Sequence, residues 1–250
     1  MLKKLYGKSE IWFAVLWIVA YCILMSAGDS LSAMIGIEKS LTLCVGILLS
    51  AVLLIFLKKN HLFEAYGFRP AQTSARSMLY YLPVILMLTA NLWYGVTFNY
   101  GLTETVLYIL SMFCVGFLEE LIFRGFLFEA MRKGTPKVAV IVSSVTFGVG
   151  HIVNLINGSG AELLPNLLQI VYATAAGFMF VMMYLKTKSL IGCIIIHGIF
   201  NALSVFTNEG KATAEMRILT CILLTVITGA YAWYLALTMK ENEKEGTKKS

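Results

Sequence analysis

The sequence predicts an all-α fold, a polytopic membrane bundle of about eight transmembrane helices. Composition is the first observation behind this prediction: of 250 residues, 58% are hydrophobic and only 14% are charged, with a mean hydropathy of +0.78. Soluble domains are closer to about half apolar and about a quarter charged. The second observation is a series of apolar runs near the roughly 20 residues that cross a bilayer. The third is an uneven placement of basic residues, which orients the bundle.

Eight apolar segments follow one another along the chain. They lie roughly at 11–27, 41–57, 78–98, 103–127, 138–156, 163–185, 189–206 and 218–237. Because they leave no room for a soluble domain, we expect one membrane domain over residues 1–250. The first segment, preceded by lysines and followed by Ser26-Ala27-Gly28, also has the features of a signal peptide. We favour an uncleaved anchor, since the charge pattern described next requires this span.

Basic residues are concentrated on alternate loops. With the N-terminus inside and eight spans, sixteen of the 20 Lys and Arg residues fall on inner segments, and the outer segments hold only Lys39, Lys211 and Arg217. This asymmetry follows the positive-inside rule and predicts that both termini face the cytoplasm. The net charge of +6 has the same origin, since the basic residues on the inner segments set the orientation and attract anionic lipid. We therefore expect the lipid bilayer, and no nucleic acid, as a partner.

Ionisable and amide side chains inside the predicted spans are the candidates for function, because such groups are costly in hydrocarbon. The candidates are Glu119, Glu120, Arg124, His151, His197 and Asn201. Counted from the nearest inner basic residue, three spans hold them at a similar depth, about 20 Å along straight helices. We therefore expect one polar chamber inside the bundle, open to water on one side.

Spacing assigns these groups to helix faces. Glu120 and Arg124 are four residues apart and can pair, whereas Glu119 points about 100° away from Glu120. His197 and Asn201 also share a face. Each group has a structural alternative: the ion pair can be purely structural, a histidine can be satisfied by a carbonyl, and Asn201 can serve helix packing. The functional interpretation rests on their conjunction.

Together, the candidate side chains fit the hydrolysis of an amide bond. Glu119 and His151 can activate a water as general bases, and His197 and Asn201 can donate hydrogen bonds to an oxyanion. No serine or cysteine at this depth has an evident base partner, so water is the expected nucleophile. The alternative is Zn²⁺ held by Glu119, His151 and His197. The residues leave both versions open. We lean to the one without a cofactor, because Asn201 is a poor zinc ligand.

Three motifs on separate spans resemble those of a known family. Glu119-Glu120-Leu121-Ile122-Phe123-Arg124 has the form EExxxR, Phe147 to His151 the form FxxxH, and His197 to Asn201 the form HxxxN. In this order they resemble the CPBP family of CAAX proteases and bacteriocin-processing enzymes, also called Abi, which is related to type II CAAX prenyl endopeptidases. The resemblance covers about residues 105–205, the expected catalytic core.

The resemblance implies an intramembrane endopeptidase, either of glutamate type or metal-dependent. Glu119 would be the base that activates water, aided by His151. Arg124 and Glu120 would orient and support this base. His197 and Asn201 would form the oxyanion site. The implied substrate is a leader, signal, bacteriocin or pheromone peptide, and the implied location is a bacterial plasma membrane.

Two other functions are compatible with a polar chamber. A non-catalytic membrane protein on the same scaffold can confer self-immunity by binding a bacteriocin, and a small transporter can use the chamber for permeation. The transporter is disfavoured, because the polar sites are confined to one half of the chain and the sequence has only four prolines. The sequence does not specify an oligomeric state.

Overall fold

Helices make up the structure, as predicted. The computed structural model describes residues 2–78, 82–155, 157 and 162–248, and over these ranges no strand forms. The main helices are α1 (Leu2–Lys8), α2 (Glu10–Ile35), α3 (Ser40–Lys59), α4 (Ala75–Met78), α5 (Pro83–Thr89), α6 (Leu102–Glu120), α7 (Glu129–Arg132), α8 (Pro136–Gly150), α9 (Leu163–Thr187), α10 (Ile191–Leu203) and α11 (Ala214–Lys248). Shorter elements are the π-helix η2 (Leu121–Phe128) and the 3₁₀ turns η1 (Ala90–Leu92), η3 (His151–Leu155), η4 (Ser204–Phe206) and η5 (Glu209–Lys211).

Each of the eight predicted apolar segments contains a helix among the described residues, but these helices are not equally long. Six are long and apolar enough to cross a membrane: Glu10–Ile35, Ser40–Lys59, Leu102–Arg132, Pro136–Leu155, Leu163–Thr187 and Ala214–Met239. Two are shorter, Pro83–Leu92 and Ile191–Phe206. At about 1.5 Å per residue, the shorter pair falls below the thickness of the hydrocarbon core of about 30 Å. The chain is thus an all-α, multi-pass membrane bundle whose shorter helices depend on their neighbours.

Local signals in the sequence set the helix ends. Ser9 caps α2 by accepting a hydrogen bond from the Trp12 backbone N–H at 3.2 Å. Gly36 ends the same helix in the left-handed region at φ 76°, where a residue without a Cβ carries no steric penalty. Pro136 lies in the first turn of α8, where its missing N–H is not needed.

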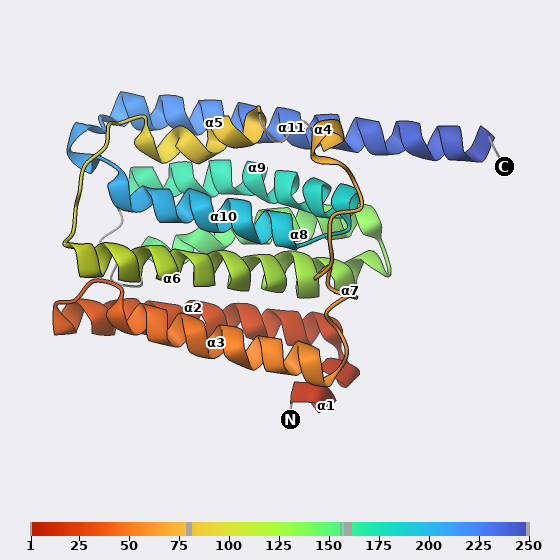
Figure 1. Ribbon diagram of the computed structural model, residues 1–250, viewed down its shortest axis with the longest axis horizontal. Coiled ribbons are helices and arrows are strands. Elements are labelled where there is room, and N and C mark those ends of the chain that lie inside the picture. Colours follow the sequence, from red (N-terminus) through yellow and green to blue (C-terminus); the bar gives the residue numbers. More distant parts are fainter. Residues whose placement is uncertain (1, 79–81, 156, 158–161, 249–250) are drawn as a thin grey trace.

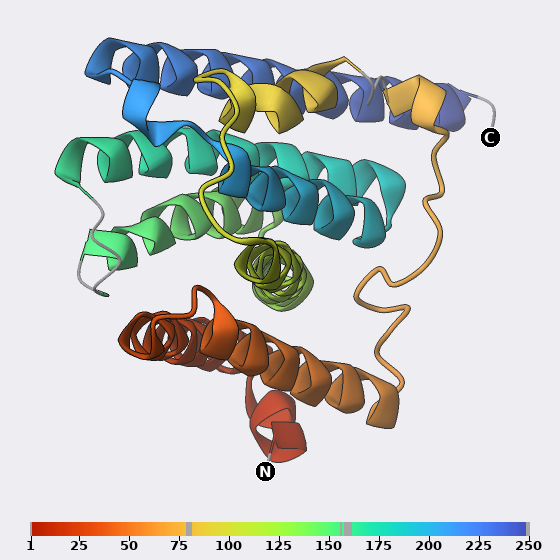
Figure 2. The ribbon, with the colours of Figure 1, turned by 60° about the vertical axis from the view of Figure 1, so that its left-hand side comes forward.

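The helices form a layered bundle. Helices α2 and α3 pair along one side, α5 and α11 lie along the opposite side, and α6, α8, α9 and α10 lie between them (Figures 1 and 2). Figure 1 also shows α11 continuing past the end of the bundle. The first apolar segment is α2, which packs against α3 and η2.

Apolar side chains cover the outside of the bundle as well as its core. Trp12, Leu48 and Trp233 are each more than 60% exposed, which suits contact with lipid rather than water. Inside, Phe13 is fully buried and packs edge-on against Phe126, with ring centroids 5.1 Å apart. Buried charge is therefore exceptional in this bundle, and it is concentrated around α6.

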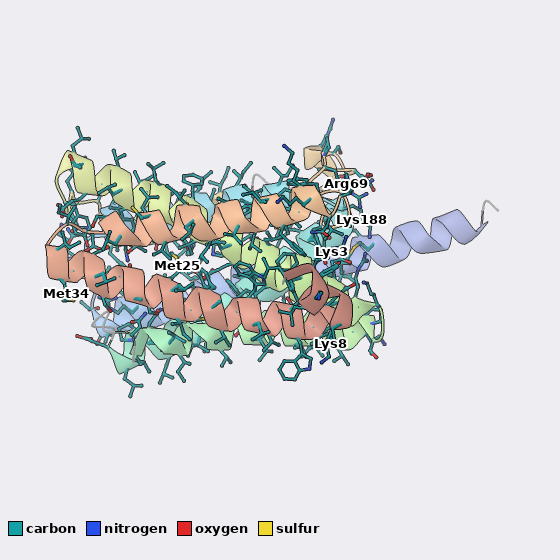
Figure 3. All side chains as sticks on the ribbon, turned by 90° about the horizontal axis from the view of Figure 1, so that it is seen from below. Lys3, Lys8, Met25, Met34, Arg69 and Lys188 are labelled. Carbon is teal, nitrogen blue, oxygen red and sulfur yellow. The ribbon has the colours of Figure 1, made fainter. Side chains whose placement is uncertain are left out.

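The two ends of the bundle differ in charge. Figure 3 shows Lys3, Lys8, Arg69 and Lys188 at one end and Met34 at the other. We call the first the basic end; it also holds the N-terminus. The opposite end carries the turn between α2 and α3. Each long helix therefore runs from one chemically distinct end to the other.

Candidate active site

Two adjacent carboxylates at the end of α6 face different partners. Glu120 is fully buried and Glu119 is 8% exposed. They begin the change from the α-helix α6 to the π-helix η2, whose eight residues are all buried. Such π-segments occur often at functional sites. A π-helix also realigns backbone groups, and the Phe123 carbonyl accepts a hydrogen bond from Ser143 Oγ of α8 at 2.9 Å.

Glu120 forms the expected ion pair with Arg124, and it also contacts His197. Its Oε1 accepts a hydrogen bond from Arg124 Nη1 at 3.0 Å, across one helical turn. The same oxygen lies 2.8 Å from His197 Nδ1 of α10. All three side chains are almost completely buried. Since a buried charge without a partner is strongly destabilising, Glu120 fixes both the guanidinium and the imidazole in place.

Aromatic rings enclose the Arg124 guanidinium and the His197 imidazole. The guanidinium lies over the Phe147 ring at 4.1 Å and near the Phe180 ring at 5.3 Å. The His197 ring stacks on Phe180 with an interplanar angle of 22°. Arg124 Nη2 also donates to the Gly177 carbonyl at 3.4 Å. Cation–π contacts of this kind gain strength when the cation is shielded from water.

Whereas Glu120 contacts α10, Glu119 is oriented by a residue of α2. Its Oε1 accepts a hydrogen bond of 2.7 Å from the hydroxyl of Tyr21 in α2. Its Oε2 lies 3.4 Å from His197 Nε2 and has no hydrogen-bond partner among the described residues. His197 thus lies between the two carboxylates, with one ring nitrogen toward each. Each carboxylate keeps its Oε2 without a hydrogen bond among the described residues, and Glu119 is the one that lines the chamber described below.

Two glycines bring α6 and α10 close enough for these contacts. A Cβ on Gly116 would lie 2.7 Å from the backbone nitrogen of Gly198, so the two backbones touch where no side chain fits. Gly116 is one turn before Glu120, and Gly198 follows His197. The close approach of the two glycines therefore places Glu120 against His197.

A second close approach joins α8 to α9. A Cβ on Gly148 would lie 2.8 Å from the Ile170 carbonyl oxygen, and one on Gly177 would lie 2.9 Å from the Ser144 carbonyl oxygen. This packing brings the Gly177 carbonyl to Arg124 and places the end of α8 beside the acidic pair. Glycine at these positions therefore serves close helix contact.

His151 and Asn201 complete the set of candidates, but they are not tied into the buried network. His151 lies where α8 passes into η3, and its ring meets Phe147 edge-on at 5.5 Å. Its backbone carbonyl accepts a hydrogen bond from the Asn166 side chain at 2.8 Å. Among the described residues, no hydrogen bond holds the His151 ring or the Asn201 amide. Both side chains are half-buried and line the chamber described next.

The candidates surround one chamber of about 290 Å³. Its polar wall includes Tyr21, Asp29, Asn91, Tyr108, Glu119, His151, Asn154, Gln169, Asn201 and Ser204. An adjoining cavity of about 60 Å³ is bordered by His151, His197 and Asn201. The structure therefore brings Glu119, His151 and Asn201 to one space, and His197 to its edge. Glu120 and Arg124 lie behind that wall and do not line it.

The carboxylates and histidines do not form a metal site as they stand. Over the part of the chain that the structure describes, no three His, Cys, Asp or Glu side chains are grouped in a way that could hold a metal ion. The geometry does not fit the ligand set Glu119, His151 and His197, and we derive no step through a metal.

Three residues of the site escaped the sequence interpretation. Tyr21 is one of many aromatic residues in apolar spans, and nothing in its local sequence marks a partner 98 positions away. Asn166 and Gln169 hold the end of α8 through the His151 carbonyl and Asn154. Both lie in the first turns of the span at 163–185. An amide in an apolar span is the signal that could have identified them.

A comparison with known protein families matches the part of the chain that holds these residues. The family model described as type II CAAX prenyl endopeptidase Rce1-like matches residues 101–203. The matched range includes α6 through α10 and all six candidate residues. No curated protein matches the chain significantly. The EExxxR, FxxxH and HxxxN motifs all fall within this range, so residues 101–203 of this multi-pass membrane protein resemble the Rce1-like type II CAAX prenyl endopeptidases.

Proposed function

We propose that the protein is an intramembrane endopeptidase that uses Glu119 to activate a water molecule. The observation that carries this proposal is the position of Glu119 on the chamber wall. Its carboxylate is held at Oε1 by Tyr21 and keeps Oε2 free of hydrogen bonds to the described protein. A buried, oriented carboxylate with one oxygen that has no hydrogen-bond partner is suited to act as a general base. The family assignment supports a CAAX-type membrane protease in general.

The proposed reaction begins with a water molecule in the chamber. Glu119 Oε2 accepts a proton from the water while the water oxygen bonds to the carbonyl carbon of the substrate. The carbonyl π-electrons move to oxygen and create an oxyanion. The amide bond then breaks as the leaving nitrogen takes the proton from Glu119. The products are a carboxylic acid and an amine, so no oxidant, reductant or covalent enzyme intermediate is required.

Asn201, His197 and His151 are the groups within reach of the reacting carbonyl. The Asn201 amide faces the chamber, and His197 Nε2 points to the same region as the free Glu119 oxygen. We assign Asn201 as a donor to the oxyanion, together with His197 in its doubly protonated form, because His197 Nδ1–H already donates to Glu120. Stabilisation of the oxyanion is commonly the largest contribution to such catalysis. His151, whose ring has no hydrogen bond to the residues that the structure describes, can assist the proton transfer from its place on the same wall.

Glu120 and Arg124 have a supporting role in this proposal. Neither lines the chamber, and their shared contacts position His197 rather than a substrate. The substrate that we propose is a leader, signal, bacteriocin or pheromone peptide processed in a bacterial plasma membrane. A peptide segment fits the chamber better than a whole folded domain, since its volume is about 290 Å³.

The test is cleavage by purified protein in detergent or nanodiscs, with products identified by mass spectrometry. Leader-like and prenylated peptides would be compared, and Glu119→Gln would run beside the wild type. We expect products from the wild type only. If wild type and Glu119→Gln bind peptides equally and neither cleaves them, the protease proposal is wrong and a peptide-binding immunity protein replaces it.

A further inference from the structure

The chamber occupies only one half of the bundle along the helix axes. On α2 its wall runs from Tyr21 to Asp29, a distance of about 12 Å toward the turn after that helix. On α6, which runs the other way, the wall extends from Glu119 back to Tyr108. Both walls therefore proceed from Glu119 toward the same end, the one opposite the basic end.

The other walls follow the same direction. On α10 and η4 the lining residues are Phe200, Asn201 and Ser204, which come at the end of the helix farthest from Lys188. On α9 the lining lies near the start, at Gln169 and Tyr172. The walls on four helices thus all extend toward the end of the bundle opposite the basic end.

An aromatic plug closes the chamber toward the basic end. Phe123 and Phe147 form its floor and are each only 4% exposed. Below them Phe126 is 1% exposed and packs edge-on against both Phe13 and Tyr66, with ring centroids 5.1 Å and 5.0 Å apart. A peptide cannot reach Glu119 through this packing without separating α2 from η2.

The opposite end of the chamber is accessible. Asp29, on the wall there, has a side chain that is 29% exposed. It is fixed by Lys39 Nζ at 2.7 Å and by Thr42 Oγ1 at 2.6 Å, both from the turn and start of α3. Exposure therefore rises from the floor of the chamber to Asp29, which marks the mouth.

The distribution of charge tells which side of the membrane the mouth faces. Among the described residues, fifteen Lys and Arg belong to segments at the basic end, against Lys39, Lys211 and Arg217 at the mouth end. Figure 3 shows four of the basic-end residues gathered opposite Met34. Basic loops are retained on the cytoplasmic side. The mouth then lies on the other side.

We propose that the chamber opens to the extracytoplasmic face of the membrane and receives its peptide substrate from there. This inference deepens the proposed function, because it restricts substrates to exported peptides and to segments of membrane proteins exposed on the outer face. Cytoplasmic proteins with lipidated C-termini have no route to Glu119. The direction of opening itself depends only on the chamber walls and the charge distribution, not on catalysis.

Cysteine labelling in cells tests the direction. Ser26→Cys places a thiol on the chamber wall, and Ser74→Cys places one on the exposed loop at the basic end. Both are made in a chain in which Cys22 and Cys44 are alanine, and that chain without an added cysteine supplies the background. A membrane-impermeant thiol reagent is applied to intact cells and, separately, to inverted vesicles. Ser204→Cys, on a different wall, is the second reporter if Ser26→Cys fails to fold.

We expect labelling of the chamber cysteine in intact cells and its loss in inverted vesicles, with the reverse for Ser74→Cys. The proposal is overturned if the chamber cysteine reacts only in inverted vesicles, or if it reacts only after detergent, which would mean entry from lipid. The same labelling is repeated with Glu119→Gln. Since labelling needs no activity, correct labelling with no cleavage would reject the endopeptidase and leave the extracytoplasmic opening standing.

Discussion

The hydroxyl of Tyr21 donates a 2.7 Å hydrogen bond to Glu119 Oε1, joining the first long helix to the acidic motif across 98 positions of the chain. The contact leaves the second carboxylate oxygen for chemistry. It also makes α2 part of the active site, although the matched family range begins only at residue 101. Tyr21 is therefore a positioning residue for the proposed base.

Removing the Tyr21 hydroxyl should reduce turnover more than substrate binding. Hydrogen bonds to charged groups contribute about 1.5–3 kcal/mol, so Tyr21→Phe should lower kcat by roughly ten- to a hundred-fold with little change in KM. Steady-state kinetics on a cleaved peptide measures this. The matched control is Tyr108→Phe, which removes another hydroxyl from the chamber wall, one that contacts Ser204. Equal losses in both variants would contradict a specific role for Tyr21.

Substitution of the two adjacent carboxylates should have different effects on activity and stability. Glu119→Gln should abolish cleavage and leave thermal stability near that of the wild type, because this carboxylate faces the chamber. Glu120→Gln should lower stability by about 3–5 kcal/mol, because it leaves Arg124 buried without its counter-ion. Thermal unfolding in detergent, measured alongside activity, separates the two. The assignment of roles is wrong if Glu119→Gln is the less stable variant.

The contact between Gly116 and Gly198 should be intolerant of a single methyl group. Gly116→Ala would place a Cβ 2.7 Å from a backbone atom and push α6 away from α10. Overpacking of this kind costs about 1–3 kcal/mol, and here it would also move Glu120 away from His197. Gly192→Ala on α10 is the control, since nothing lies within 4 Å of its Cβ. Activity and melting temperature should fall for the first and stay unchanged for the second.

Much of this arrangement follows from the sequence, and the remainder depends on packing between distant segments. Apolar runs predicted all eight helices, and the spacing of Glu120 and Arg124 predicted their ion pair. The depth of three motifs predicted one chamber. The sequence did not predict that His197 would lie between both carboxylates, because that depends on how closely α6 and α10 approach. Nor did it identify Tyr21, whose role comes from a helix far away along the chain.

Chelators should leave the activity intact. No three potential ligands are grouped for a metal among the described residues. We therefore expect equal cleavage rates before and after dialysis against EDTA and 1,10-phenanthroline, with metal content measured by mass spectrometry on the same sample. Loss of activity that returns on addition of Zn²⁺ would show that the two histidines and Glu119 rearrange around an ion. In that case Tyr21→Phe should alter the affinity for Zn²⁺, because it releases a carboxylate oxygen for the metal.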